Sequence, residues 1–532
     1  MGALNSLSTF DSEGRKRSQA GKAKYLGLTG TFLNVWITVG CATAMALFGY
    51  DQGVFGGIIV TPDFLETMGN PDSELQGTIV SLYDIGCFFG AMATAVFGER
   101  LGRKKTLLIG VVVMSIGAVL QTCSFSVAQM IVARLITGLG NGVNTATAPV
   151  WQSETSKPSW RGRLVVLETI MVTVGFSLSN WMTYGFSFVQ GSISWRFPIA
   201  FQLVFSFILL GTIPWLPESP RWLLAHGQQE EGVAVLVALE GDDATPQDDI
   251  IVSQKAEILE AVRLETMHTP GWKDIMRGHT GETGMIKRLA LGAGTQWMQQ
   301  LVGINVTSYY LPLVLQNSVG LSNNLSRLLA ACNSVSYLFF SFGGLMLIEK
   351  AGRRKLMMWG AAGQCFCYIL ITAMLSRTDD PMDGTKFGAA ATAFFFLYYV
   401  FYGISWHSVP WLYPTEINSL SMRTKGAAVA TASNWISNYI VVQITPPGIA
   451  HLGWRFYIIW AVFNASFIPL IWLVYPETAN RHLEDIDRIY RENKGMIFVF
   501  NKEEVIQVER PHRFVVAEQM DRRDEEVEGT EL

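Results

Sequence analysis

The sequence predicts an all-α membrane protein with twelve transmembrane helices in two six-helix pseudo-repeats, together with short cytoplasmic helices. First, 49% of the 532 residues are hydrophobic and only 16% are charged, which is too apolar for ordinary soluble domains. Second, apolar stretches of about 20 residues, the length that crosses a hydrocarbon core, recur along the chain. Third, loop motifs of the first half return in the second half.

Twelve apolar stretches follow one another between residues 32 and 475. Short cytoplasmic loops hold an excess of Lys and Arg, so the basic clusters at 100–105 and 353–355 indicate the cytoplasmic side. The connection 59–76 has no basic residue and faces the other side. The predicted spans lie near 32–58, 77–98, 105–123, 128–150, 164–184, 197–216, 287–315, 325–348, 355–375, 387–413, 425–445 and 455–475.

Charge and composition divide the chain into five parts, with both termini predicted to be cytoplasmic. The segment between the halves is polar, and Ile258, Leu259 and Val262 have helical spacing within a run from Ser253 to Glu265. The parts are an N-terminal tail (1–30), a six-helix bundle (31–216), a cytoplasmic helical linker (217–286), a second six-helix bundle (287–476) and a C-terminal tail (477–532).

The six cysteines and seven histidines form no metal or disulfide pattern, and no acid–base set or phosphate-binding glycine loop is present. We therefore expect no metal, no cofactor and no enzymatic activity. The formal net charge of −4 gives no indication of a nucleic-acid partner, and none is expected. The expected surroundings are a lipid bilayer, and the protein is expected to function as a monomer.

Three loop motifs recur in the second half. The sequence Glu99-Arg-Leu-Gly-Arg-Lys-Lys105 returns as Glu349-Lys-Ala-Gly-Arg-Arg-Lys355, 250 residues later. The pair Glu154 and Arg161 returns as Glu416 and Arg423, and Pro217-Glu-Ser219 returns as Pro476-Glu-Thr478. Positive-inside topology explains the basic residues but not the matched glutamates. We expect a cytoplasmic latch of several weak ion pairs, formed by Glu99, Arg103, Glu154, Arg161, Arg163, Glu218, Arg221, Glu349, Arg353, Glu416, Arg423 and Glu477.

Taken together with these loops, several further motifs make the chain resemble the sugar porter family of the major facilitator superfamily over roughly residues 30–485. The further motifs are Arg134-Leu-Ile-Thr-Gly-Leu-Gly-Asn-Gly142, Pro217-Glu-Ser-Pro-Arg221, Gln299-Gln-Leu-Val-Gly-Ile-Asn305, Pro410-Trp411 and Asn434-Trp-Ile-Ser-Asn438. The run Ser194–Ala200 is most similar to the fungal branch. The resemblance implies the major facilitator fold, with substrate bound at mid-membrane between the two halves.

A sugar or polyol needs partners that both donate and accept hydrogen bonds, as amide side chains do. The resemblance implies that Gln299, Gln300, Asn305, Trp411, Asn434 and Asn438 contact substrate and that Tyr309 and Tyr310 form an outer gate. In a continuous helix, Gln299 and Tyr310 share a face, and Gly303 permits a bend. The alternative for each amide is a plain hydrogen bond between helices.

Two positions depart from the family pattern. The fifth span has Thr169, beside Glu168, where the family usually has a glutamine. The loss of that amide at a substrate-binding position favours a substrate other than a typical hexose, and polyols such as glycerol become credible. Before Pro410, His407-Ser-Val409 replaces a turn of small residues, and His407 is interpreted as either a packing residue or a polar pocket group.

Asp51 lies within the first predicted span, where an unpaired aspartate is unfavourable by about 2.5–3.5 kcal/mol on insertion scales. Arg134 of the fourth span is its expected partner. In proton-coupled members of the family, such a carboxylate alternates between binding arginine and binding a proton. We therefore assign proton coupling to Asp51 and Arg134. The alternative is a structural ion pair that never titrates.

The predicted function is transport of a sugar or polyol by alternating access, as proton-coupled uptake across the plasma membrane. Facilitated diffusion is the alternative mechanism, because facilitative relatives also keep this aspartate. A nutrient sensor with a carrier fold is a further alternative, but such a sensor would signal through a long cytoplasmic extension, and the tail here is short.

Overall fold

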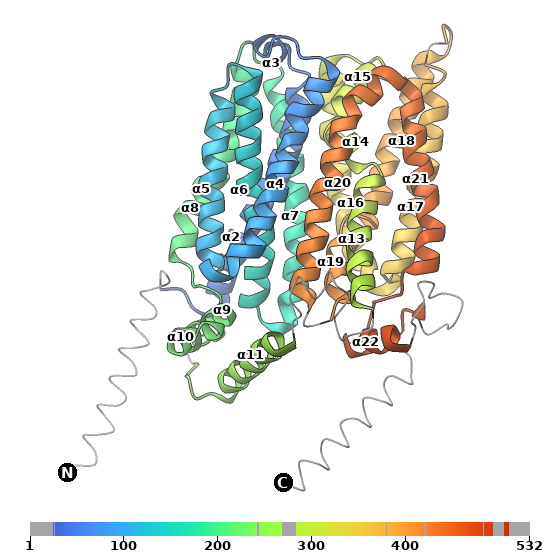
Figure 1. The fold of residues 1–532 in the computed structure, drawn as a ribbon. Coiled ribbons are helices and arrows are strands. Elements are labelled where there is room, and N and C mark those ends of the chain that lie inside the picture. Colours follow the sequence, from blue (N-terminus) through green and yellow to red (C-terminus); the bar gives the residue numbers. More distant parts are fainter. Residues whose placement is uncertain are drawn as a thin grey trace, which may run out of the picture. The chain divides into compact units, whose positions relative to one another are not determined.

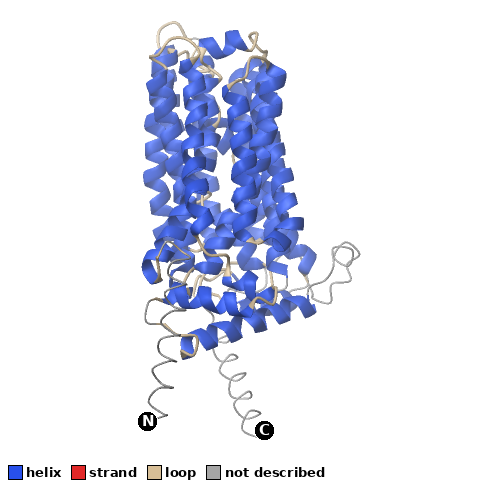
Figure 2. Cartoon of the chain, turned by 90° about the vertical axis from the view of Figure 1, so that its left-hand side faces the viewer, coloured by secondary structure: helices blue, strands red, loops and turns tan. Residues whose placement is uncertain are grey.

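The computed structural model describes residues 25, 27–241, 244–268, 284–378, 380–419, 422–481, 483–492 and 505–509. Within these ranges the regular secondary structure is helical, without strands (Figure 2). The chain divides into two compact units, Met1–His268 and Thr269–Leu532, called unit 1 and unit 2 below. The boundary falls inside the predicted linker 217–286. The finer five-part division stays a prediction.

Unit 1 is built from long helices followed by shorter ones (Figure 1). The segment Ser253–Glu265, predicted to be an amphipathic helix, lies within α11. The elements are α2 (Gly30–Ile58), α3 (Pro62–Thr67), α4 (Ser73–Leu101), α5 (Arg103–Thr122), α6 (Val127–Thr155), α7 (Pro158–Phe186), α8 (Ile193–Thr212), η1 (Ile213–Trp215), α9 (Pro220–Ala225), α10 (Gln229–Glu240) and α11 (Asp249–His268).

Unit 2 also consists of helices, and two of the predicted spans in it are interrupted. The predicted seventh span is divided into three pieces and the predicted tenth span into two. The elements are α13 (Met285–Leu301), α14 (Ile304–Ser308), α15 (Leu311–Asn317), α16 (Asn323–Ala351), α17 (Arg353–Leu375), α18 (Gly384–Ile404), α19 (Val409–Ile417), α20 (Arg423–Leu452), η3 (Gly453–Arg455), α21 (Phe456–Val474) and α22 (Leu483–Glu492).

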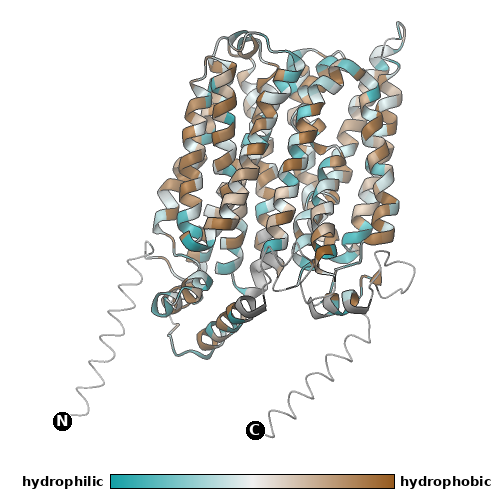
Figure 3. Ribbon diagram, in the orientation of Figure 1, coloured by the Kyte–Doolittle hydropathy of each residue, from teal (hydrophilic) through white to brown (hydrophobic). Residues whose placement is uncertain are grey.

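Many helices expose apolar side chains, as expected of a protein whose solvent is lipid. Phe207, Phe339 and Met346 are 68%, 71% and 75% exposed, and hydrophobic residues extend along the long helices (Figure 3). Seven helical stretches of the described chain are long and apolar enough to cross a membrane, and one of them, Lys425–Val474, covers most of α20 and all of α21. The chain is therefore a multi-pass membrane protein, and the count of twelve spans stays a prediction.

Close helix packing in unit 1 depends on small residues, because lipid offers no hydrophobic drive for helix association. A Cβ atom on Gly138 or Gly142 of α6 would lie 2.1 Å from a backbone oxygen of α4, that of Tyr83 or of Cys87. A Cβ on Gly140 would lie 2.4 Å from the backbone nitrogen of Met114 on α5. The glycines of the Arg134–Gly142 motif therefore let α6 pack tightly between α4 and α5.

Candidate functional site

A buried ion pair joins the first and fourth long helices of unit 1. Nη1 of Arg134 on α6 lies 3.1 Å from Oδ2 of Asp51 on α2, and both side chains are 0% exposed. The second guanidinium nitrogen, Nη2, donates to the carbonyl oxygen of Val80 at 3.1 Å. The structure thus brings the two predicted proton-coupling residues into direct contact.

Aromatic rings cover the guanidinium group of Arg134. Its central carbon lies 4.0 Å from the ring centre of Phe55 and 4.4 Å from that of Tyr83. Cation–π contacts gain strength when water is excluded, so these rings help to hold a cation inside the bundle. The close approach of α4 and α6, permitted by Gly138, places Tyr83 and Val80 beside Arg134.

In unit 2 the helix that carries most of the predicted substrate residues breaks at Gly303. Gly303 has φ +93°, a left-handed conformation that favours glycine, and it separates α13 from α14. The hydroxyl of Tyr368 donates to the carbonyl oxygen of Gly303 at 2.8 Å. Tyr398 and Asn464 each donate to that of Val302 at 3.1 Å. Side chains therefore satisfy the carbonyl groups that the break releases, as a membrane interior requires.

The break corrects one expectation drawn from helical spacing. A continuous helix would place Gln299 and Tyr310 on one face, but α13 ends at Leu301 and Tyr310 precedes α15. Tyr310 instead donates to the carbonyl oxygen of Val442 on α20 at 3.0 Å. The bend expected at Gly303 is present.

Amide side chains from both sides of the break bond to α20. Asn434 of α20 donates to Oε1 of Gln299 at 2.9 Å and to Oε1 of Gln296 at 2.6 Å. Asn305 of α14 donates to Oδ1 of Asn438 at 2.5 Å, and also to Gln300. The five amides predicted to bind substrate thus form, together with Gln296, two buried hydrogen-bonded groups, called the amide network below. One group is Gln296, Gln299 and Asn434, and the other is Gln300, Asn305 and Asn438.

Gln296 is a residue of this network that was not predicted from the sequence. It lies three residues before Gln299 on α13 and so shares its face, which was the available signal. Besides accepting from Asn434, it donates through Nε2 to the carbonyl oxygen of Pro410 at 2.8 Å. This bond ties the network to the start of α19, two residues from the break that separates α18 and α19.

The remaining predicted substrate and gate residues lie outside the amide network. Trp411 is half-buried on α19, and Thr169 belongs to α7 of unit 1. Tyr309 is buried, and its ring centre lies 6.4 Å from that of Tyr310. Their roles in substrate binding and gating stay predictions.

His407 lies among aromatic side chains. Its Nδ1 is 2.7 Å from the hydroxyl of Tyr337, and its ring packs edge-on against that ring at 5.3 Å. The ring of Tyr402 is 6.4 Å away. Because Gln299 donates to the carbonyl oxygen of Trp406 at 3.0 Å, the turn that carries His407 is linked to the amide network. The side chain thus both packs and forms a polar contact.

A charged cluster lies at the start of α5 in unit 1. Arg103 binds Glu154 through a pair of 2.8 Å bonds, from Nε to Oε2 and from Nη2 to Oε1. Glu218 accepts from the backbone nitrogen of Arg103 at 2.9 Å and also from that of Lys104. Burial raises the pKa of Glu218, and the backbone donors oppose that rise. Gly102, at φ +83°, makes the turn that aims these amides at Glu218.

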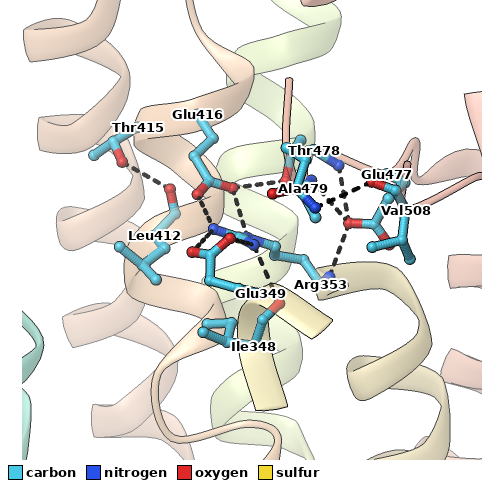
Figure 4. Close-up of polar contacts among 11 residues, drawn as sticks. Ile348, Glu349, Arg353, Leu412, Thr415, Glu416, Glu477, Thr478, Ala479 and Val508 are labelled. Atoms are coloured by element: carbon cyan, nitrogen blue, oxygen red, sulfur yellow. Dashed lines mark hydrogen bonds and ion pairs between the residues drawn. The ribbon is translucent and has the colours of Figure 1, made fainter. Parts of the chain in front are cut away.

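Unit 2 repeats this cluster with the matched residues (Figure 4). Arg353 binds Glu416 at 2.7 Å through Nη2 and at 3.1 Å through Nε. Glu477 accepts from the backbone nitrogen of Arg353 at 2.8 Å, and Gly352 has φ +80°. Arg353 has an additional carboxylate partner, Glu349, at 2.9 Å. The duplication inferred from the loop sequences is therefore present at the level of individual hydrogen bonds.

The other predicted latch residues are less well defined. Glu99 is exposed, and Arg221 lies half-buried on α9. The side chains of Arg161, Arg163 and Arg423 fall outside the described part of the structure. In the described residues, both clusters close within their own unit, so a latch between the halves stays a prediction.

Comparison with known proteins identifies the family of this chain. The family described as "Sugar (and other) transporter" matches residues 36–490. The MFS-type transporter oryC of Aspergillus oryzae is 53% identical over 95% of this chain and 93% of its own length. The sugar transporter STL1 of Saccharomyces cerevisiae is 37% identical over 88% of this chain and 83% of its own. This chain belongs to the sugar transporter family.

Solved structures agree with that assignment. The proton:xylose symporter XylE, described as a major facilitator superfamily protein, matches with a TM-score of 0.71 and 25% identity, over 86% of this chain and 99% of its own. A partially occluded inward-open form of XylE from E. coli matches with a TM-score of 0.71 and 24% identity, over 84% and 99%. The expected major facilitator fold is confirmed. As a member of the sugar transporter family, the chain is a membrane transporter and not an enzyme.

Proposed function

We propose that this sugar transporter family member carries a sugar or polyol by alternating access, as proton-coupled uptake across the plasma membrane with both termini in the cytoplasm. The observation that carries this proposal is the buried amide network of unit 2. In it, Asn434 of α20 bonds to Gln299 of α13, and Asn305 of α14 bonds to Gln300 of α13 and to Asn438 of α20.

The network suits a ligand rich in hydroxyl groups. Each amide has a donor group and an acceptor oxygen, as a hydroxyl does, so substrate can replace amide–amide bonds without leaving a polar atom unpaired. Trp411, which is half-buried on α19, offers an apolar face for the C–H side of a sugar. Relatives named as a sugar transporter and as a high-affinity glucose transporter support this substrate class.

Proton coupling is assigned to Asp51 and Arg134. A proton on Asp51 cancels its charge and weakens the 3.1 Å contact with Arg134, so proton binding favours a rearrangement of α2 against α6. The membrane potential supplies about 2.3 kcal/mol per charge per 100 mV, which is enough to concentrate substrate. The likeness to a protein named as a proton:xylose symporter supports this assignment.

The clusters around Arg103 and Arg353 are proposed to act on the cytoplasmic side. Each ties two helices to the segment that follows its bundle, through Glu218 or Glu477. Each unit can then move as one body while the outer and inner sides open in turn. Basic residues concentrate in the same connections, which supports a cytoplasmic position by the positive-inside rule.

Uptake in a transport-deficient cell tests the proposal. Labelled glucose and labelled glycerol are supplied separately, with and without an uncoupler, and unlabelled sugars and polyols compete. We expect accumulation of one label, sensitive to the uncoupler and to competing polyols or sugars. Accumulation that stops at equilibrium and ignores the uncoupler indicates facilitated diffusion. Binding and signalling without flux would indicate a sensor and contradict transport.

A further inference from the structure

Glu168 on α7 is a buried acid that is not part of the Asp51–Arg134 pair. Its side chain is 1% exposed, and among the described residues neither carboxyl oxygen has a hydrogen-bond partner. By contrast, Asp51 has Arg134 beside it. An isolated carboxylate is far more costly to bury than the neutral acid, because burial removes water and supplies no counter-charge.

The charged and titratable groups on the helices packed against α7 are accounted for. On α2, Asp51 binds Arg134 of α6, and the hydroxyl of Tyr50 donates to the carbonyl oxygen of Pro198. Glu154 of α6 binds Arg103, and Arg196 of α8 binds the carbonyl oxygens of Thr122 and Ser124. Cys41 of α2 is within electrostatic reach of Glu168 but supplies no positive charge. On α7 itself, Tyr184 lies about four turns after Glu168, and the side chains of Arg161 and Arg163 fall outside the described part.

The buried carboxyl groups of unit 1 outnumber the cations of its bundle interior. Asp51, Asp84 and Glu168 are 0%, 0% and 1% exposed. In the described part of unit 1, Arg134 is the only buried Lys or Arg side chain, and it binds Asp51. Three carboxylates cannot all be neutralised by one guanidinium group, so at least one acid is expected to hold a proton. Glu168, which has no hydrogen-bond partner among the described residues, is the strongest candidate.

Glu168 lies apart from the Asp51–Arg134 pair. A Cβ on Gly175 would lie 1.9 Å from the carbonyl oxygen of Ala46, and one on Gly49 would lie 1.8 Å from that of Val172, so these stretches of α2 and α7 are in contact. Glu168 precedes Val172 by one turn. Further along both helices, a Cβ on Gly57 would lie 2.5 Å from the side chain of Thr183, so α2 and α7 run in the same direction. Glu168 is therefore displaced from Asp51 by roughly 10 Å towards the ends at which α2 and α7 begin.

We propose that Glu168 is a second proton-binding site of unit 1, which holds one proton as a neutral acid in this conformation and exchanges it with water during transport. Release breaks the O–H bond and leaves the electron pair on the carboxylate, and the proton passes to water. Gln152 of α6 also has a buried oxygen, Oε1, without a partner in the described structure. Its side chain bonds to Thr38 of α2 at 3.2 Å, near the same end of the bundle.

The binding of a proton can be measured without knowing the substrate. The full chain is purified in lipid, and its infrared absorption is recorded across a pH titration for the unmutated protein, Glu168→Gln and Asp51→Asn. We expect a carboxylic-acid C=O band near neutral pH that Glu168→Gln lacks and Asp51→Asn retains. Glu168→Asp keeps an acid at the site and should keep a shifted band. If the spectrum of Glu168→Gln matches that of the unmutated protein while folding is intact, the proposal is wrong.

Exchange of that proton during transport rests on the proposed proton-coupled function and has its own measurement. Vesicles with the full chain are supplied with labelled glucose or glycerol under a pH gradient. We expect Glu168→Gln to slow proton-driven accumulation at least fivefold while exchange of substrate without a gradient stays within twofold, and Glu168→Asp to restore most of the accumulation. Unchanged gradient-driven accumulation in Glu168→Gln contradicts the proposal. If the unmutated protein ignores the gradient, proton coupling itself fails, whereas the infrared titration still decides whether Glu168 binds a proton.

Discussion

Arg353 on α17 and Glu416 on α19 share two hydrogen bonds, at 2.7 and 3.1 Å, in the same fork that Arg103 and Glu154 form in unit 1. In both units a glycine at positive φ precedes the arginine, and a glutamate 115 or 124 residues later accepts from the arginine backbone. The planar guanidinium group matches a carboxylate in a way that the point charge of lysine does not. The repeated fork therefore restrains helix direction as well as balancing charge.

Replacing Arg353 by Lys should destabilise the protein. Lysine keeps the charge but loses the fork to Glu416 and the bond to Glu349, in a site where the Arg353 side chain is 5% exposed. We expect a loss of about 1–3 kcal/mol in the free energy of unfolding. Thermal unfolding of the purified protein measures it. Arg103→Lys is the matched control and should cost less, because the Arg103 side chain is 20% exposed. An equal or larger loss for Arg103→Lys would contradict the role given to burial.

Replacing Gly303 by Ala should damage the helix break. The new Cβ would lie 2.4 Å from the hydroxyl oxygen of Tyr368, at a φ of +93° that alanine rarely adopts. Gly320→Ala separates the two effects, since Gly320 has φ +79° but no atom within 4 Å of its Cβ. We expect about 1 kcal/mol of destabilisation at Gly320 and clearly more at Gly303, as measured by thermal unfolding. Similar losses at both positions would mean that contact with Tyr368 is unimportant.

Replacing Asn434 by Ala should weaken substrate binding. The change removes the donor to Gln296 and Gln299, which then lose their alignment. We expect KM to rise about tenfold, equivalent to about 1.4 kcal/mol, with a smaller effect on the amount of folded protein. Concentration-dependent uptake measures KM.

Asn464→Ala serves as the control for that substitution. Asn464 is an equally buried amide whose Nδ2 donates only to backbone carbonyl oxygens in the described structure, those of Val302 and Trp460. It should lower stability and leave the relative affinities for competing sugars unchanged. If the two variants changed selectivity alike, the amide network would have no special role in recognition.

Several elements could be read from the sequence because their signals are local. α5 and α17 begin directly after Gly102 and Gly352, and α11 covers the amphipathic run 253–265. Other boundaries depend on contacts that hydropathy does not report. The predicted span 387–413 is broken between Ile404 and Val409, and α20 continues through Pro446 and Pro447 to Leu452, beyond the predicted end near 445.

Most residues of the candidate site were predicted from the sequence, but the hydrogen bonds between them were not. Asp51 and Arg134 could be paired in advance because each is too costly to bury alone. The family motifs pointed to the amides of α13, α14 and α20, but the pairing of Asn434 with Gln296 depends on how two helices face each other. For the same reason the sequence could not show that Glu168 has no hydrogen-bond partner in the described structure, because this depends on the packing of α7.

Substrate-driven proton movement tests the central claim most directly. Cells or vesicles containing the unmutated protein are compared with Asp51→Asn, and the external pH is recorded as the transported sugar or polyol is added. Because Asn cannot bind and release a proton, we expect alkalinisation with the unmutated protein and none with the variant, which should still exchange substrate. Equal alkalinisation in both would contradict the role of Asp51, and transport unaffected by pH, uncoupler or the substitution would show that the protein is not a proton symporter.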